Sequence, residues 1–155
     1  MKDFKRKKKN YLPYKHDYSF IYFSNVFVDG PNYGVQDKSF SEFIDYFDNF
    51  LFILEHCEKY KIPLYIKLHP LSLKYREREE YSHEFYFHNC LLNIINKKKY
   101  KSNSFIEILD GSLPNNYFKF LKKPIALTPR SNVSIEMGYL GIPCFTFFDN
   151  YWKNF

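Results

Sequence analysis

The chain lacks the features that mark several protein classes. No apolar run approaches the roughly 20 residues that a membrane-spanning helix needs. No apolar stretch follows the charges at its start, as a secretory signal would require. The three cysteines, Cys57, Cys90 and Cys144, are an odd number without C-x-x-C spacing. We therefore expect reduced thiols, packed in the core of a cytoplasmic protein.

Net charge is concentrated at the N-terminus. The net charge is +6, and most of it lies in the first nine residues, where six basic side chains stand against Asp3 alone. The basic residues there are Lys2, Lys5, Arg6, Lys7, Lys8 and Lys9. Because the near-neutral remainder is not a basic recognition face, we expect no nucleic-acid partner. Residues 1–17 are predicted to be a basic tail or interdomain linker. The alternative is a weak contact with an anionic membrane, at the inner face of the cell membrane.

The sequence is rich in apolar and aromatic residues. Hydrophobic residues make up 45% of the 155 positions and aromatic residues 22%. This composition excludes a disordered chain, and a chain of this length forms one domain with a substantial core.

Runs of β-type residues alternate with segments of helical periodicity. The predicted strands are 19–28, 64–68, 105–109, 125–128 and 144–148, and the predicted helices are 39–61, 76–99, 115–122 and 131–140. Such alternation predicts right-handed crossovers and a parallel sheet. We expect an α/β fold: a single Rossmann-like domain over residues 18–155, with an open, mostly parallel sheet of about five strands and helices on both faces.

A histidine stands at the end of the second predicted strand. His69 precedes Pro70, which biases the histidine toward an extended backbone and so holds the imidazole at the strand tip. From there it can donate a hydrogen bond or a proton to a phosphate, since the pKa of histidine lies near neutrality. The alternative is a histidine satisfied by ordinary contacts at a strand–loop junction.

A serine motif opens the helix predicted at 131–140. With Ser131 as N-cap, Ser134 is the third helical residue, so two hydroxyls gather with free N–H groups at the positive end of the helix dipole. Such a helix start binds anions, and Arg130 adjoins it. Glu136, in the second turn, can accept hydrogen bonds from a ribose or sugar hydroxyl. Simple capping is the alternative for the serines, and a favourable interaction with the dipole is the alternative for Glu136.

Other strand ends hold further polar residues. Asn25, Asp29 and Asp110 stand at or near such ends, where ligands of open parallel sheets bind. Turn-forming Asn and Asp also occur there for backbone reasons alone. The chain has no Asp-x-Asp motif, and His83 and His88 lack the spacing of metal ligands. We expect neither a metal nor a cofactor.

Together the motifs resemble those of the nucleotide-binding half of bacterial GT-B glycosyltransferases that build surface polysaccharides. The likeness is to capsule polysaccharide biosynthesis proteins, including Kdo transferases, and to bacterial sialyltransferases and polysialyltransferases. Those families place His-Pro after one strand, and a Ser-containing helix start, Glu and Gly-x-Pro after a later one. The matching residues here are His69-Pro70, Ser131 with Ser134, Glu136, and Gly141-Ile142-Pro143. Residues 23–29 also look like the strand that opens this domain in the capsule group, and the resemblance covers most of residues 18–150.

The resemblance implies roles for these side chains. His69 would bind, and could protonate, the departing phosphate of a CMP-activated sugar. Ser131 and Ser134 would bind the same phosphate, and Glu136 the ribose or base side. It also implies a second domain with the acceptor site, for which this chain has no room. We therefore expect the donor-binding half of a larger enzyme, truncated at its C-terminus, with a second protein chain as a possible partner and little activity alone.

Three other functions stay open. One is transfer of glycerol phosphate from CDP-glycerol, and another is a UDP-sugar 2-epimerase-like isomerase half. The last is a non-catalytic remnant or assembly module. Preference for cytidine or uridine nucleotides would separate the transferases from the epimerase.

Overall fold

The structure, a computed structural model, describes residues 17–24, 46–70, 89, 93, 105–129 and 131–147. Its elements are β1 (Ser19–Phe23), α3 (Tyr46–Tyr60), β2 (Leu64–Lys67), β3 (Ile106–Leu109), η5 (Asn115–Phe120), β4 (Pro124–Thr128), α5 (Val133–Tyr139) and β5 (Cys144–Thr146). Within these residues five strands form one sheet in the order β3-β2-β1-β4-β5, and all neighbouring pairs are parallel. The expected α/β, Rossmann-like sheet is therefore confirmed.

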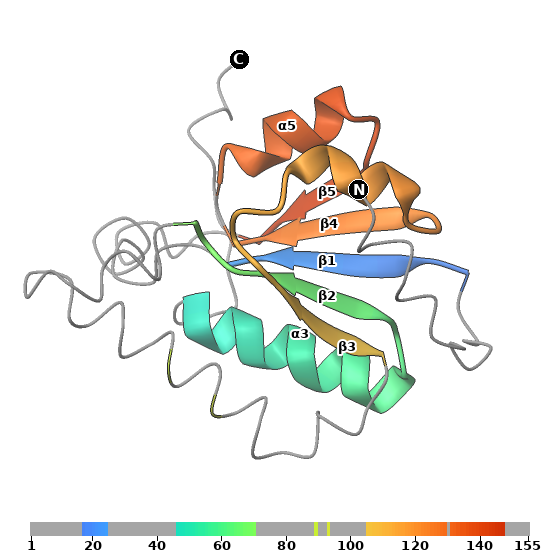
Figure 1. Ribbon diagram of the computed structural model, residues 1–155. Helices are drawn as coiled ribbons and strands as arrows, with labels where there is room; N and C mark the ends of the chain where they lie inside the picture. The colour runs from blue at the N-terminus through green and yellow to red at the C-terminus, as the bar shows by residue number, and fades with distance from the viewer. Residues whose placement is uncertain are drawn as a thin grey trace, which may run out of the picture.

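Helices cover both faces of this sheet, with α3 on one side and η5 and α5 on the other (Figure 1). Successive residues of a strand point to opposite faces. Tyr22 of β1 accordingly joins the core cluster under α3, whereas Ile21 and Phe23 join the cluster under η5 and α5. Apolar residues on both sides of a strand are typical of parallel sheets that are buried on both faces.

Each helical layer packs through a few large side chains. On α3 the buried residues Phe50, Ile53, Leu54 and Cys57 recur at helical spacing and face the sheet. On the opposite face the ring of Phe118, in η5, meets that of Phe23 edge-on at 5.4 Å between centroids. Met137 of α5 is fully buried in the same cluster.

α3 and α5 end in the same way. After α3, Lys61 has a φ of 55° and the N–H of Ile62 bonds to the carbonyl of Cys57 at 3.0 Å. After α5, Gly141 has a φ of 72° and the N–H of Ile142 bonds to the carbonyl of Met137 at 2.9 Å. These are Schellman motifs, in which a left-handed residue closes the helix. In both units the isoleucine is buried, and the proline that follows it stands immediately before the next strand.

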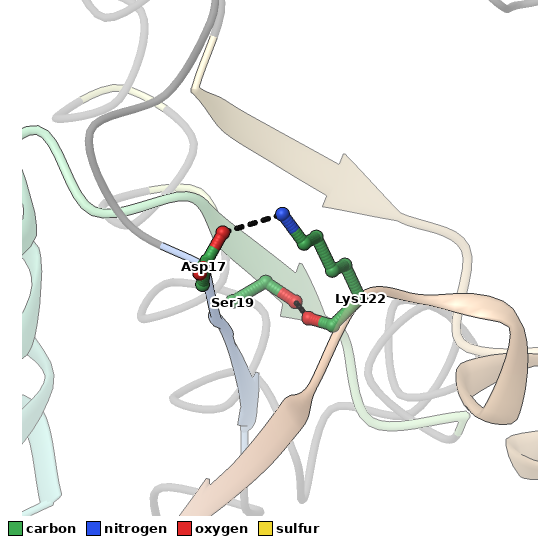
Figure 2. Close-up of polar contacts among 3 residues, drawn as sticks. All are labelled: Asp17, Ser19 and Lys122. Carbon is green, nitrogen blue, oxygen red and sulfur yellow. Dashed lines mark hydrogen bonds and ion pairs between the residues drawn. The ribbon is translucent and has the colours of Figure 1, made fainter.

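The amino edge of the sheet is fastened where β1 begins (Figure 2). The buried Ser19 hydroxyl donates to the carbonyl of Lys122 at 3.3 Å, which ties β1 to the turn before β4. The Lys122 ammonium also pairs with Asp17 at 2.5 Å, but the two side chains are 71% and 69% exposed, so this ion pair contributes little stability. No candidate site residue that the structure describes lies at this edge.

The other expectations have mixed outcomes. The predicted short helix is a 3-10 helix, and the helix predicted at 131–140 begins two residues later than expected. Residues 1–16, 25–45 and 148–155, and most of the helix predicted at 76–99, lie outside the described residues. Cys57 is buried as expected, Cys144 is only half-buried, and Cys90 lies outside the described residues. In the part of the chain that the structure describes, no helix is long and apolar enough to cross a membrane.

Candidate functional site

The candidate residues that can be placed follow the carboxyl ends of three strands. His69 comes two residues after β2, Asp110 directly after β3, and Ser131 three residues after β4. Since the sheet is parallel throughout, all three stand at its carboxyl edge. The predicted position of His69 at the end of a strand is confirmed. The ligand roles assigned to these residues remain predictions.

The strand order gives this edge a switch point. From β1 the chain moves outward through β2 to β3, and then returns to place β4 and β5 on the other side of β1. Ligands of open α/β sheets bind outside the carboxyl ends of the strands at such a point. His69 and Ser131 come from the two strands that flank β1, whose axes are about 10 Å apart at ordinary strand spacing. The end of β1 therefore lies between the turns that carry His69 and Ser131.

Ser24, directly after β1, holds the His-Pro turn in place. Its buried hydroxyl oxygen accepts the backbone N–H of His69 at 2.8 Å, and its own N–H donates to the carbonyl of Lys67 at 3.0 Å. The histidine is half-buried. The end of β2 and the hydroxyl of Ser24 thus hold the backbone of His69, from which the imidazole extends.

The turn after β3 packs against the same segment. A Cβ on Gly111 would lie 2.8 Å from the carbonyl oxygen of Leu68 and 3.1 Å from the carbonyl carbon of His69, so this close approach needs glycine. Asp110 uses one carboxylate oxygen for the hydroxyl and N–H of Ser112, at 2.6 and 2.7 Å. These two bonds hold the pKa of Asp110 below its ordinary value, and the bond from the Ser112 hydroxyl has the larger effect. The contacts of Asp110 are thus those of a turn-forming residue, which was the alternative to a ligand-binding role.

The serine motif opens α5 slightly earlier than the helix bounds suggest. The helix is assigned from Val133, after Asn132, but Asn132 already has helical backbone angles and makes no side-chain capping bond. The Ser131 hydroxyl accepts the N–H of Val133 at 3.3 Å, and the Ser134 hydroxyl donates back to the Ser131 carbonyl at 2.9 Å. Both serines therefore stabilise the helix start. A hydroxyl that accepts a hydrogen bond still has its own hydrogen to donate, which leaves Ser131 a donor for a ligand, while the hydrogen of Ser134 is used within the turn.

A buried lysine and two polar side chains form a chain of contacts beside this motif. The Lys67 ammonium donates to the amide oxygen of Asn115 at 2.8 Å, and the amide nitrogen of Asn115 donates to a carboxylate oxygen of Glu136 at 2.7 Å. Three elements meet in this chain: the end of β2, the first turn of η5 and the first turns of α5. We call it the Lys67–Asn115–Glu136 chain.

Lys67 occupies the last row of the sheet, in register with Phe23 of β1 and Leu109 of β3. It is 7% exposed, and its ammonium lies 5.8 Å from the centre of the Phe23 ring. Burial lowers the pKa of Lys67, while the negative charges of Glu136 and Asp110 act in the opposite direction. Glu136 itself is exposed, so its second carboxylate oxygen can accept from a ligand.

Sequence reasoning missed three residues of this edge: Ser24, Lys67 and Asn115. A charged residue that ends a strand with an otherwise apolar interior was a usable signal for Lys67. Nothing local marks Asn115, whose contacts come from segments 48 and 21 residues away. The predicted site residues Asn25, Asp29 and Arg130 lie outside the described residues.

Comparisons with known proteins add no identification. No protein-family model, curated protein or solved structure matches the chain. Among the described residues, no three His, Cys, Asp or Glu side chains are grouped so that they could hold a metal ion.

Proposed function

We propose that this domain is the donor-nucleotide-binding half of a glycosyltransferase for bacterial surface polysaccharide, and that it takes a CMP-activated sugar at the carboxyl edge of its sheet. The observation that carries the proposal is the placement of His69 and Ser131 on the two strands that flank β1, at the switch point of the sheet. The motif resemblance supports the choice of glycosyltransferase and of cytidine. We place the protein in the cytoplasm, where such donors are available.

In this proposal the phosphate lies above the end of β1. The imidazole of His69 donates a hydrogen bond to a phosphate oxygen and can protonate the departing phosphate. Ser131 donates its hydroxyl hydrogen from the other side, and Ser134 acts by holding the Ser131 carbonyl and hence the turn. Glu136 accepts from ribose hydroxyls through its exposed carboxylate. A second domain would supply the acceptor and exclude water, so this chain alone binds its ligand weakly.

Calorimetric titration of CMP, CDP, UMP and UDP into the purified chain tests this proposal. We expect binding of CMP and CDP in preference to the uridine nucleotides. His69→Ala removes one hydrogen bond to a charged group, about 1.5–3 kcal/mol, which weakens binding about ten- to hundredfold. Ser131→Ala should weaken binding more than Ser134→Ala, because the Ser134 hydrogen is already used in the turn.

His56→Ala is the matched control. His56 is an exposed histidine on α3, on the other face of the sheet from α5, where its ring stacks on that of Phe52 and lies tilted against that of Tyr60. Its loss should leave nucleotide affinity unchanged. Preference for uridine nucleotides would favour the epimerase-like alternative. Equal affinity for all four in every variant, or no binding by the folded wild type, would leave the assembly module.

A further inference from the structure

Lys67 is a buried cation whose hydrogen-bond partner is uncharged. The side chain leaves the end of β2 beneath η5, and its ammonium donates to the Asn115 amide oxygen at 2.8 Å. Among the described residues no carboxylate lies within ion-pair distance of it. Glu136 and Asp110 act on the ammonium only from beyond ion-pair distance. Burying a charge outside a direct ion pair is unfavourable, so its retention at the carboxyl edge of the sheet calls for an explanation.

Asn115 separates this cation from the nearest acid. Its amide oxygen accepts from Lys67 and its amide nitrogen donates to Glu136 at 2.7 Å, so both ends of the amide are fixed. The amide therefore stands between two opposite charges that would otherwise be free to pair directly. An ammonium has three hydrogens to donate, and Asn115 uses one of them.

A phosphate that binds at this edge also needs a cation there, because the neighbouring charges are negative. The other charged side chains that the structure describes around Lys67 are Asp110 and Glu136, both acidic and both exposed. Without Lys67, a phosphate dianion would approach two negative charges. With Lys67, the anion gains an attractive partner whose desolvation has already occurred in the folded protein.

We propose that Lys67 is a phosphate ligand at the carboxyl edge, and that Asn115 is a positioning residue that keeps its ammonium out of an ion pair with Glu136. The inference rests on the proposed function and deepens it, because it assigns the charge that recognises the phosphate group. The same chemistry would recognise a nucleoside monophosphate or inorganic phosphate.

Replacing Lys67 with methionine distinguishes this role from a structural one. Methionine keeps an apolar side chain of similar length beside the Phe23 ring and removes the cost of burying a charge that is in no direct ion pair. Lys67→Met should therefore melt at the same temperature as the wild type or higher, yet bind phosphate more weakly. A lysine that served only the fold would show the reverse.

The experiment titrates CMP, inorganic phosphate and cytidine into the full chain and its variants by calorimetry. Lys67→Met should weaken CMP and phosphate about ten- to hundredfold, the loss of a hydrogen bond to a charged group, and leave cytidine unchanged. Lys59→Met, at an exposed lysine of α3, is the matched control and should change nothing. Asn115→Ala should weaken inorganic phosphate several-fold by releasing Lys67 toward Glu136, and the added Glu136→Gln should restore it.

The outcomes separate this inference from the proposed function. Unchanged CMP and phosphate affinity in Lys67→Met, or a lower melting temperature without an affinity change, overturns the inference and leaves the proposed function standing. Lysine-dependent phosphate binding without any cytidine preference supports the inference and removes the proposed function. No binding by the folded wild type overturns both. The wild type gives an independent check, since the Lys67 ammonium resonance should shift as inorganic phosphate is added and saturate with the calorimetric Kd.

Discussion

The hydroxyl oxygen of Ser24 accepts the backbone N–H of His69 at 2.8 Å, across 45 residues of sequence. This bond joins the end of β1, where the proposed phosphate lies, to the turn that presents the imidazole. Ser24→Ala leaves that N–H without its acceptor, which should cost about 1–3 kcal/mol of stability. It should also lower CMP affinity, since the backbone of His69, which positions the imidazole, is no longer held by Ser24. Urea unfolding and calorimetry measure the two effects.

Ser19→Ala is the control for that substitution. Ser19 is likewise a buried serine of the β1 segment, and its hydroxyl also bonds to a distant backbone group. It lies at the amino edge of the sheet, however (Figure 2). The variant should lose stability and keep its CMP affinity. If both serine variants affected CMP affinity equally, the special role of the Ser24–His69 bond would be wrong.

Gly111→Ala should damage the site from the β3 side. The added Cβ would lie 2.8 Å from the Leu68 carbonyl oxygen and 3.0 Å from the Cα of Pro70, and backbone atoms cannot easily move aside. We expect a loss of about 1–3 kcal/mol by overpacking, together with weaker nucleotide binding as the His-Pro turn shifts. Unchanged stability and affinity would show that the turn after β3 can move away from the His-Pro turn without a free-energy cost.

The glycines of the α5 segment should respond with opposite signs. Gly141 has a φ of 72° with nothing near its would-be Cβ, so Gly141→Ala costs about 1–2 kcal/mol from backbone conformation alone. Gly138 lies within α5 in equally open space, where alanine stabilises a helix by about 0.5–1 kcal/mol. Thermal unfolding of the two variants checks the pair. Equal effects would contradict the Schellman geometry.

Cys57 should make stability fall at alkaline pH. Burial raises the pKa of its thiol from 9.0 to about 12, so in the unfolded chain the thiol ionises first. Its contribution to stability is complete below pH 9 and is lost as pH rises from 9 toward 12. Cys57→Ala removes this contribution, so its unfolding free energy should fall less steeply than that of the wild type over this pH range. Parallel slopes in urea unfolding would contradict the burial effect.

Much of the fold was predictable because local patterns determine it. Apolar β-type runs fixed the strands, and alternation with helices fixed their parallel order. Gly141 marked the end of α5. Lys61 has the same left-handed backbone conformation after α3, but lysine does not indicate a helix end. From sequence alone, only Pro63 predicted the end of that helix.

The site was less predictable because its contacts are non-local. The strand-end rule placed His69, Asp110 and Ser131 correctly. The predicted start of α5 was two residues early, since the helix begins at Val133, but the predicted capping by Ser131 appears in its bond from the N–H of Val133. Asn115 was missed because its role comes from two side chains that meet only in the folded protein.

Amide chemical-shift mapping with CMP tests the central claim most directly, because it locates the ligand on the sheet. We predict that the largest shifts fall at the carboxyl edge, at Ser24, His69 and Ser131, and saturate with a single Kd. The amide chemical shifts of Ser19 and Lys122, at the amino edge, should not change. Shifts centred on the amino edge or on the outer face of α3, or no saturable shifts at all, would contradict the account.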